Sequence, residues 1–389
     1  MALTKVTSNV LGNSAVTSAK IALSNTGLTF NDGSNQLTAA SSFGFKNRVI
    51  NGAMIFDQRN VGVAKTSQAV ASSPFLCDRF RFGGGGGASR MTTQQVQDAP
   101  PGFVNSLKFT VTTTETLSAG SVNVVSHIIE GANVVDFAWG TSSATSATLS
   151  FWVKTSLTGT HAVAIRSDGP SNNYSYVASY TVNQANTWEY KTIAVPAITL
   201  GSWGGLTAST TYGIRLDWNI GSYTDVQTAA NTWTSGGYFT VAGANQIITN
   251  NGATFQLTGV QFEKGPTATA FDYRPYGLEL SLCQRYYQKY GGEGAGWQSI
   301  ASGQVESATL AGMNLVYIVP MRAAPTVTKS GDMRVQAGTN WMTFTLGTVY
   351  AGKNSCSINL NITGGTGGQG MIVRNYNDGT AYMDFSAEL

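Results

Sequence analysis

Between residues 103 and 263 the sequence consists of short segments of alternating polarity that are separated by turn-forming residues. In one segment, Leu149, Phe151 and Val153 point one way and the residues between them, including Trp152, point the other, which is the two-residue period of a strand. Turns about 8–12 residues apart are typical of β-sandwiches. The predicted strands are residues 106–114, 122–130, 148–154, 161–166, 174–182, 188–195, 212–218, 237–241 and 253–263. We therefore predict an all-β fold built around an antiparallel jelly-roll sandwich, with sheets packed about 10 Å apart.

The composition supports a β protein and excludes two classes of partner. Only 11% of the residues are charged, against about 25% in an average soluble domain, and Thr, Val and aromatic residues that pack well on a pleated surface are abundant. The net charge of +3 is too small to indicate a nucleic-acid partner. No apolar run is long enough to span a bilayer. We therefore predict no nucleic-acid binding and no membrane insertion.

The cysteines give no sign of a disulfide framework or a metal site. Cys77, Cys283 and Cys356 are far apart and odd in number, and they form no ligand motif with each other or with a histidine. We predict no metal and no cofactor, because an acidic loop of the EF-hand type is also absent; a structural calcium, which jelly rolls can bind, stays an open alternative. Residues 1–5 lack the charged-then-apolar layout of a signal peptide. We therefore expect that the protein leaves the cell by assembly and lysis, not by secretion.

Changes of pattern divide the chain into four regions. Residues 1–45 are rich in Ser, Thr, Asn and Ala with sparse apolar positions, which is typical of an extended arm that needs a partner to order it. Residues 46–265 form the predicted sandwich, and residues 266–291 form a linker with a short helix. Residues 292–389 form a second, smaller C-terminal β domain, with predicted strands at residues 298–308, 314–319, 326–329, 333–337, 341–346, 355–362, 371–374 and 381–385.

The linker helix is predicted from apolar residues at helical intervals over residues 278–290, after a proline at 275 and before a glycine at 291. A helix this short is marginal in water, so it needs packing from elsewhere. We expect Leu278, Leu282 and Tyr286 to be buried, either under the sandwich or against symmetry-related copies. Arg274 and Glu279 are either solvated charges, which we favour, or an inter-domain or inter-subunit pair.

Ten short motifs occur in a fixed order between about residue 47 and residue 327. They are NRVINGAM at 47–54, DQR at 57–59, DRF at 78–80, SFWVK at 150–154, YTV at 180–182, TWEYK at 187–191, LTGVQFE at 257–263, FDYRP at 271–275, LCQRYY at 282–287 and PMRAAPTV at 320–327. The ordered set resembles the tail-fibre and appendage proteins of tailed bacteriophages. This resemblance implies a carbohydrate-binding-module-like jelly roll carried on a virion, and it leaves residues 1–45 and the last stretch unmatched.

Aromatic side chains on predicted loops are the candidates for glycan binding, because their rings stack on the apolar faces of sugars while Asn and Asp take the hydroxyls. In the sandwich the candidates are Tyr174, Tyr176, Trp203, Tyr223 and Trp233, with Asn172, Asn173, Asp217 and Asp225 nearby. In the C-terminal domain Trp297, Trp341 and Tyr382 are candidates for a surface at the tip. For any single ring, packing in the core or between subunits is the reading that we favour.

Few groups in the sequence indicate catalysis. The two histidines, His127 and His161, each fall in a predicted strand, and no serine-elbow motif is present. A glycosidase needs two carboxylates held roughly 5–10 Å apart. The pairs that flank loops are Asp217 with Asp225 and Glu130 with Asp136. The long β-helix repeats of processive spikes are absent, and we predict no enzymatic activity.

Together these features predict a structural virion protein of a tailed phage, namely a subunit of a homotrimeric tail fibre that is assembled in the host cytoplasm. Residues 1–45 would attach to other virion proteins, and the β domains would bind host cell-surface polysaccharide. A trimer would bury strand edges and multiply weak glycan contacts through avidity. Two alternatives stay open, a head-decorating or collar fibre anchored to the capsid and a glycan-degrading tailspike.

Overall fold

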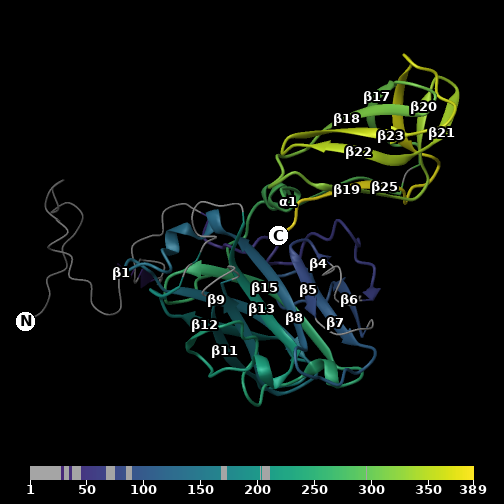
Figure 1. The fold of residues 1–389 in the computed structure, drawn as a ribbon. Coiled ribbons are helices and arrows are strands. Elements are labelled where there is room, and N and C mark those ends of the chain that lie inside the picture. Colours follow the sequence, from purple (N-terminus) through teal and green to yellow (C-terminus); the bar gives the residue numbers. More distant parts are fainter. Residues whose placement is uncertain are drawn as a thin grey trace, which may run out of the picture. The chain divides into compact units, whose positions relative to one another are not determined.

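The structure is a computed structural model that describes residues 28–29, 35–36, 45–66, 75–84, 90–167, 173–201, 203, 211–294 and 296–389. The chain divides into two units, Met1–Phe45 and Lys46–Leu389. In the first unit, strands β1 (Leu28–Thr29) and β2 (Asn35–Gln36) pair antiparallel (Figure 1). Apart from this pair and Phe45, the predicted arm lies outside the described residues, so its attachment role stays a prediction.

The second unit begins with two sheets whose neighbouring strands all pair antiparallel. The seven-stranded sheet has the order β14 (Trp233–Ser235), β11 (Tyr174–Val182), β10 (Gly159–Arg166), β13 (Tyr212–Ser222), β8 (Val122–Glu130), β5 (Phe80–Gly84) and β4 (Phe75–Cys77). The six-stranded sheet has the order β12 (Glu189–Val195), β9 (Ala147–Thr155), β15 (Thr254–Lys264), β7 (Ser106–Val111), β6 (Met91–Val96) and β3 (Lys65–Thr66). Single turns of 3-10 helix lie at Gly131–Asn133, Val135–Phe137, Thr224–Val226 and Ile247–Thr249.

The inner faces of these two sheets form one apolar core. Phe151 on β9 and Trp218 on β13, which belong to opposite sheets, meet edge to face with their ring centroids 5.6 Å apart. Leu149, Phe151 and Val153 are fully buried, as their alternation predicts. Burying one side chain of this size contributes roughly 1.5–3 kcal/mol, so the core is the main source of stability. The predicted all-β class and antiparallel sandwich are confirmed.

The outer face of the seven-stranded sheet is covered by other parts of the chain. Val241 and Ala244, from the segment after β14, pack on Ala162 and Ala164 of β10. Next to them, Asp217 on β13 is also fully buried. The structure therefore leaves little of this face to solvent.

The predicted linker helix is present but shorter than expected. Helix α1 spans Tyr276–Gln284, and Tyr287–Gly291 is a strand, β16, that pairs with β25 (Tyr382–Ser386). The expectation of helix through Tyr290 is wrong because this distant strand pairing overrides the local periodicity. Tyr286 is fully buried among Ile50, Phe56, Ile128, Cys283 and Leu389, and Leu282 packs on the edge of that cluster. Leu278 is 47% exposed, so its packing against another subunit stays a prediction.

Two further antiparallel sheets form the C-terminal β region, coloured green to yellow in Figure 1. The smaller sheet has the order β16, β25 and β19 (Thr326–Ser330). The larger one has the order β21 (Asn340–Thr343), β20 (Met333–Ala337), β24 (Gly370–Asn375), β17 (Ser299–Val305), β18 (Leu310–Val316), β23 (Ser355–Asn361) and β22 (Thr345–Ala351). Val335, Ile358, Val373 and Phe385 lie in a second apolar core between them.

The described part of the chain contains no helix that is long and apolar enough to cross a membrane. Within the same residues, no three His, Cys, Asp or Glu side chains are grouped so that they could hold a metal ion. Cys77, Cys283 and Cys356 are all buried and free. Burial raises the pKa of each of these thiols, which keeps them protonated.

Candidate functional site

Two aromatic side chains form the floor of a groove on the outer face of the six-stranded sheet. Trp152 on β9 and Tyr190 on β12 lie opposite each other in register, with ring centroids 5.3 Å apart. They point away from the core because Phe151, Val153 and Ile193 on the same strands point into it. Tyr190 is 43% exposed and Trp152 is half-buried. The floor is therefore an aromatic surface that the core does not use.

The facing wall of the groove consists of two more aromatic rings. Phe103 precedes β7, and Phe271 follows β15; their ring centroids are 5.0 Å apart at an angle of 79°. Tyr273 packs on both rings, at 4.8 Å from Phe271 and 5.7 Å from Phe103. Its hydroxyl donates a hydrogen bond of 2.8 Å to the carbonyl of Gly102. This bond ties the Phe103 loop to the segment that carries Phe271.

A glycine lets the floor and the wall meet. Gly259, at a bulge in β15, has a φ of +61°, which favours glycine over any other residue. A Cβ atom at this position would lie 2.8 Å from the ring of Phe103 and 2.9 Å from the ring of Trp152. Both rings therefore close over the backbone at a place where no side chain fits.

Two polar residues of β15 hold the wall in place. Glu263 accepts hydrogen bonds from the backbone N–H of Thr269 (2.9 Å) and from its hydroxyl (2.6 Å). Gln261 donates to the carbonyls of Thr269 (3.3 Å) and Ala270 (3.4 Å), and its Oε1 accepts from the N–H of Asp272 (2.8 Å). Both side chains are almost fully buried, so these bonds are shielded from water.

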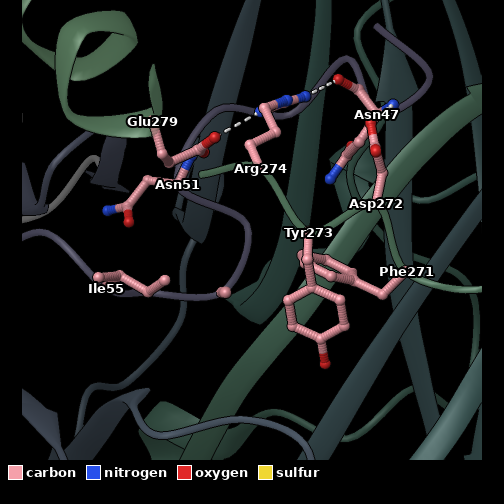
Figure 2. Close-up of a pocket in the computed structure, with 9 residues that line it drawn as sticks. Asn47, Asn51, Ile55, Phe271, Asp272, Tyr273, Arg274 and Glu279 are labelled. Atoms are coloured by element: carbon pink, nitrogen blue, oxygen red, sulfur yellow. Dashed lines mark hydrogen bonds and ion pairs between the residues drawn. The ribbon is translucent and has the colours of Figure 1, made fainter. Parts of the chain in front are cut away.

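The segment after Ala270 alternates between the groove and a polar anchor. Phe271 and Tyr273 pack on each other and on Phe103 in the wall of the groove, whereas Asp272 and Arg274 contact the turn that begins at Asn47. Figure 2 shows this division: Arg274 reaches between Glu279 and Asn47, and the two aromatic side chains point away from that contact. A small recess of about 20 Å³, with room for little more than one water molecule, lies between the two sides and is lined by Asn47, Asn51, Ala53, Ile55, Phe271, Asp272, Tyr273, Arg274 and Glu279.

The anchor includes a buried ion pair. Arg274 lies 2.8 Å from Glu279 Oε2 and donates to the carbonyls of Asn47 and Val49, the latter at 3.2 Å. Asp272 Oδ2 accepts from the N–H of Asn47 at 3.1 Å. The expectation that Arg274 and Glu279 are solvated charges is therefore wrong, because the turn at residues 47–51 supplies the partners that their burial requires.

The groove is large enough for several rings of a ligand. Its volume is about 460 Å³, and it is lined by Phe103, Ser150, Trp152, Tyr190, Thr192, Gly259, Ala268, Thr269, Ala270 and Phe271. Ligand sites in proteins usually fall between about 300 and 1,000 Å³. No residue in this lining is charged. The arrangement therefore offers aromatic faces, hydroxyls and backbone carbonyls to a neutral ligand.

A polar cluster lies on the same outer face, two positions along β9 from Trp152. Asp98 accepts from Lys154 (2.7 Å), Trp188 Nε1 (3.2 Å) and Gln256 Nε2 (3.1 Å). The hydrogen bond from Lys154 is the main cause that lowers the pKa of the Asp98 carboxyl. The carboxylate therefore stays ionised and holds Trp188 beside the groove face.

Three aromatic candidates from the sequence lie in the core. Trp203 and Trp233 pack on Trp139 and on each other, and Tyr176 packs on Trp233, with ring centroids 5.0 to 5.6 Å apart. Their polar atoms donate to the carbonyls of Ala194, Leu200 and Pro196. The prediction that Tyr176 and Trp203 stand on loops as ligand surfaces is wrong, because both are buried. Trp233, half-buried, packs against the same core.

The polar candidates do not gather in one place either. Asp217 is fully buried between Arg166 (3.2 Å) and Arg215 (2.7 Å), so it is not available to a ligand. Asp225 is exposed and accepts from the N–H of Gly120. Tyr174 and Asn173 are half-buried, and Tyr223 is 36% exposed. Asn172 lies outside the described residues, and the other sandwich candidates do not line the groove.

One feature of the sequence indicates the groove, although it was not among the predicted glycan-binding residues. Trp152 is a large aromatic at an outward position of a strand whose other positions are correctly assigned to the core. Its partner Tyr190 lies in the TWEYK motif, but their pairing depends on a register between β9 and β12 that sequence spacing does not give. Phe271 and Tyr273 lie in the FDYRP motif, for which only a junction role was predicted.

The groups considered for catalysis have structural partners. His127 lies in β8, and its Nε2 is 3.1 Å from the carbonyl of Ile50. His161 lies in β10, 3.0 Å from the carbonyl of Leu157. Burial lowers the pKa of both imidazoles. Glu130 is buried and accepts from Tyr286 Oη at 2.7 Å.

In the C-terminal region two of the three tip candidates come together. Trp297 and Trp341 lie with ring centroids 5.2 Å apart, and Tyr376 joins both. Tyr382 lies apart from them on β25, where the ammonium group of Lys289 is 4.3 Å from its ring centroid. Tyr376 is not among the candidates predicted from the sequence.

No protein-family model and no curated protein matches the chain. Among solved structures, a protein from Bacteroides thetaiotaomicron with a proposed sugar-binding role matches 57% of this chain and 100% of its own at 10% identity and a TM-score of 0.33. The enzymatically active domain of tailspike protein 4 of bacteriophage CBA120 matches 51% of this chain and 21% of its own, at 13% identity and a TM-score of 0.29. A family 11 carbohydrate-binding module from Clostridium thermocellum matches 53% of this chain and 95% of its own, at 14% identity and a TM-score of 0.25. TM-scores this low do not show a family for this chain.

Proposed function

We propose that the protein binds a glycan chain in the groove on the outer face of the six-stranded sheet. The observation that carries this proposal is the convergence of Trp152, Tyr190, Phe103 and Phe271 on one uncovered face. These rings come from strands and loops that are far apart in the sequence. Aromatic faces held in this way stack on the apolar faces of sugar rings.

The lining favours neutral sugars. Thr192 is exposed beside Tyr190, and Ser150 and Thr269 add hydroxyls along the groove. Such groups exchange hydrogen bonds with sugar hydroxyls, and the lining contains no charge that would select an anion or a cation. A purely apolar ligand would leave the Thr192 hydroxyl without a partner, whereas the Thr269 hydroxyl already donates to Glu263.

Contacts within the protein fix the wall of the groove in the absence of a ligand. Gln261 and Glu263 fix residues 269–272 by hydrogen bonds that are largely shielded from water, and Arg274 anchors the next turn. Binding therefore costs little ordering of the protein, which improves affinity for a weakly interacting ligand such as a sugar. The motifs GVQFE and FDYRP, which carry the resemblance to phage fibres, supply these wall and anchor residues.

Affinity electrophoresis of the full chain tests the proposal. Native gels would contain xylan, mixed-linkage β-glucan, galactan or polysaccharide extracted from bacterial surfaces. We expect retardation in at least one gel, weakened about fivefold or more by Trp152→Ala or Tyr190→Ala, since one stacked ring contributes roughly 1 kcal/mol. Tyr223→Ala is the matched control, because Tyr223 is similarly exposed but lies outside the groove. Equal losses for Tyr190→Ala and Tyr223→Ala would contradict the proposal.

We also propose an assembly and a location for the protein. It is a non-enzymatic subunit of a homotrimeric tail fibre of a phage virion, which is attached through residues 1–45 and binds host polysaccharide. The ordered motifs support it, and a capsid-anchored fibre is the alternative location. Light scattering that gives a stable monomer would contradict the trimer, and cross-linking of residues 1–45 to tail or capsid proteins separates the two locations. Release of reducing sugars from a bound polysaccharide would indicate a glycan-degrading spike instead.

A further inference from the structure

A second cluster of aromatic rings lies on the larger sheet of the C-terminal region. Trp297, Trp341 and Tyr376, named here the aromatic triad, meet pairwise with ring centroids 4.9 to 5.2 Å apart and interplanar angles of 65° to 72°. Trp297 is 44% exposed, and the other two rings are half-buried. The triad therefore presents ring surface to solvent although each ring has two aromatic neighbours.

The backbone holds Trp297 at the surface against its own preference. Its φ is +68°, a left-handed conformation that is strained for a bulky residue. The N–H of Trp297 donates to the carbonyl of Asn375 at 3.2 Å, which fixes this conformation. Strain that keeps an aromatic ring exposed serves no purpose in core packing, and it is consistent with a contact surface.

Two arginines lie beside the triad on the same face of the sheet. Arg334 on β20 pairs in register with Arg374 on β24, and their neighbours Val335 and Val373 are fully buried on the other face. Arg334 stacks on Tyr376, with its guanidinium 3.7 Å from the ring centroid, and Asp332 neutralises it through two contacts of 2.9 and 3.1 Å. Like charges in register repel each other, so a second negative charge at this place would be stabilising.

Arg374 lacks the carboxylate that Arg334 has. Its Nε donates to Ser299 Oγ at 3.1 Å, and none of the ion pairs between described residues includes it. It lines a depression of about 510 Å³ together with Ser302, Gly338, Gly370 and Ile372, among others. Gln336, in register with Trp341, also lines it, and its buried Oε1 has no partner among the described residues. The depression thus contains a cation and an acceptor, and it borders an aromatic surface.

We propose that this face is a second glycan site, which binds an acidic sugar with its carboxylate on Arg374 and its ring on the aromatic triad. A guanidinium matches a carboxylate with two parallel hydrogen bonds, and an exposed indole matches the apolar face of a sugar ring. The Oε1 of Gln336 accepts a sugar hydroxyl. This site does not depend on the sandwich groove, whose lining carries no charge.

The proposal is tested by measuring how the full chain binds polygalacturonate, which is acidic, and galactan, which is neutral. We expect the acidic polymer to bind, and Arg374→Gln and Trp297→Ala each to weaken it at least fivefold. Trp152→Ala, in the sandwich groove, leaves this binding unchanged. Arg334→Gln is the matched control, since it removes a guanidinium that Asp332 already neutralises, and we expect it to weaken binding less than Arg374→Gln does.

Thermal unfolding of each variant shows whether it is folded, and Arg374→Lys, which keeps the charge but not the planar fork, replaces Arg374→Gln if that variant is unstable. A loss with Arg374→Lys also supports the carboxylate geometry. Absence of binding to polygalacturonate, or equal binding by wild type, Arg374→Gln and Arg374→Lys, would overturn the proposal. Failure of the sandwich groove would show separately, as neutral-glycan binding that is absent or that Trp152→Ala does not weaken.

Discussion

The two outer faces of the sandwich are built from the same alternating strands but serve different ends. On the seven-stranded sheet the outward positions hold small residues such as Ala162 and Ala164, or polar groups such as Asp217, and other segments of the chain cover them. On the six-stranded sheet the outward positions hold Trp152 and Tyr190, which remain partly exposed. The outward residues of a strand therefore indicate whether other parts of the chain cover it. Small side chains and ion-paired groups indicate a covered face, and large rings that remain exposed indicate a binding site.

Asp217 offers the strongest test of the covered face. Asp217→Ala leaves Arg166 and Arg215 without the carboxylate between them, and breaking a buried pair in this way costs about 3–5 kcal/mol. Urea unfolding at neutral pH measures the loss. Asp225→Ala, the control with an exposed carboxylate, should cost less than about 1 kcal/mol. Equal losses for the two variants would show that the face is not sealed.

Acid pH should change the contributions of Asp78 and Asp98 to stability with opposite signs. Asp78, in the turn between β4 and β5, is fully buried, and this burial raises its pKa from 3.8 to about 6. The folded state then binds more protons than the unfolded state between these values, so stability falls by up to roughly 3 kcal/mol as pH rises from about 4 to about 6. Asp98 on the groove face has a lowered pKa, so its contribution is present above pH 3.8 and is lost as pH falls further.

Urea unfolding at pH values from 3 to 7 measures whether the contribution of Asp78 to stability falls as pH rises. In Asp78→Asn the fall in stability between pH 4 and 6 should shrink relative to the wild type. His127, whose pKa is lowered by burial, contributes a rise in stability with pH up to about 6.5, but it does so in both proteins. The difference between the two curves therefore isolates Asp78, and a difference that is flat with pH contradicts the expected shift.

Gly259 tests how tightly the open face is built. Gly259→Ala combines a φ of +61° with Cβ contacts under 3 Å to Phe103 and Trp152, so we expect a loss of about 1–3 kcal/mol together with weaker glycan retardation. Gly252→Ala is the matched control, because Gly252 has a φ of +75° and open space around its Cβ position. Equal losses of stability in the two variants, with glycan binding unchanged in both, would contradict the expectation that Phe103 and Trp152 must pack directly over Gly259.

The smallest expected effect concerns one hydroxyl of the wall. Tyr273→Phe removes the hydrogen bond to the carbonyl of Gly102, which contributes about 0.5–1 kcal/mol at a residue that is 58% exposed. We expect a two- to fourfold loss of glycan affinity in calorimetry because the Phe103 loop loosens. Tyr276→Phe, at 66% exposure, removes a hydroxyl outside the groove and should change nothing. An unchanged affinity for Tyr273→Phe would mean that ring packing alone holds the wall.

The sequence was sufficient for the fold class because period-two alternation fixes strands locally, as in Leu149–Val153. It was insufficient for the groove, because Trp152 and Tyr190 meet only through the register of two strands, and Phe271 reaches them only through buried hydrogen bonds to Gln261 and Glu263. The helix was extended too far at Tyr287, where pairing with β25 decides the conformation. Tyr176 and Trp203 were misplaced because turn residues around them indicate a loop whether the ring points inward or outward.

The alternation within residues 270–274 has a consequence for how such proteins diversify. Phe271 and Tyr273 pack in the aromatic wall of the groove, and Asp272 and Arg274 belong to the anchor, so inserting or deleting one residue would exchange the two sets and destroy both. Substitutions at the aromatic positions, by contrast, leave the anchor intact. This stretch should therefore keep its length among homologues while its aromatic positions change, so that new ligand preferences arise by replacement and never by a change of spacing.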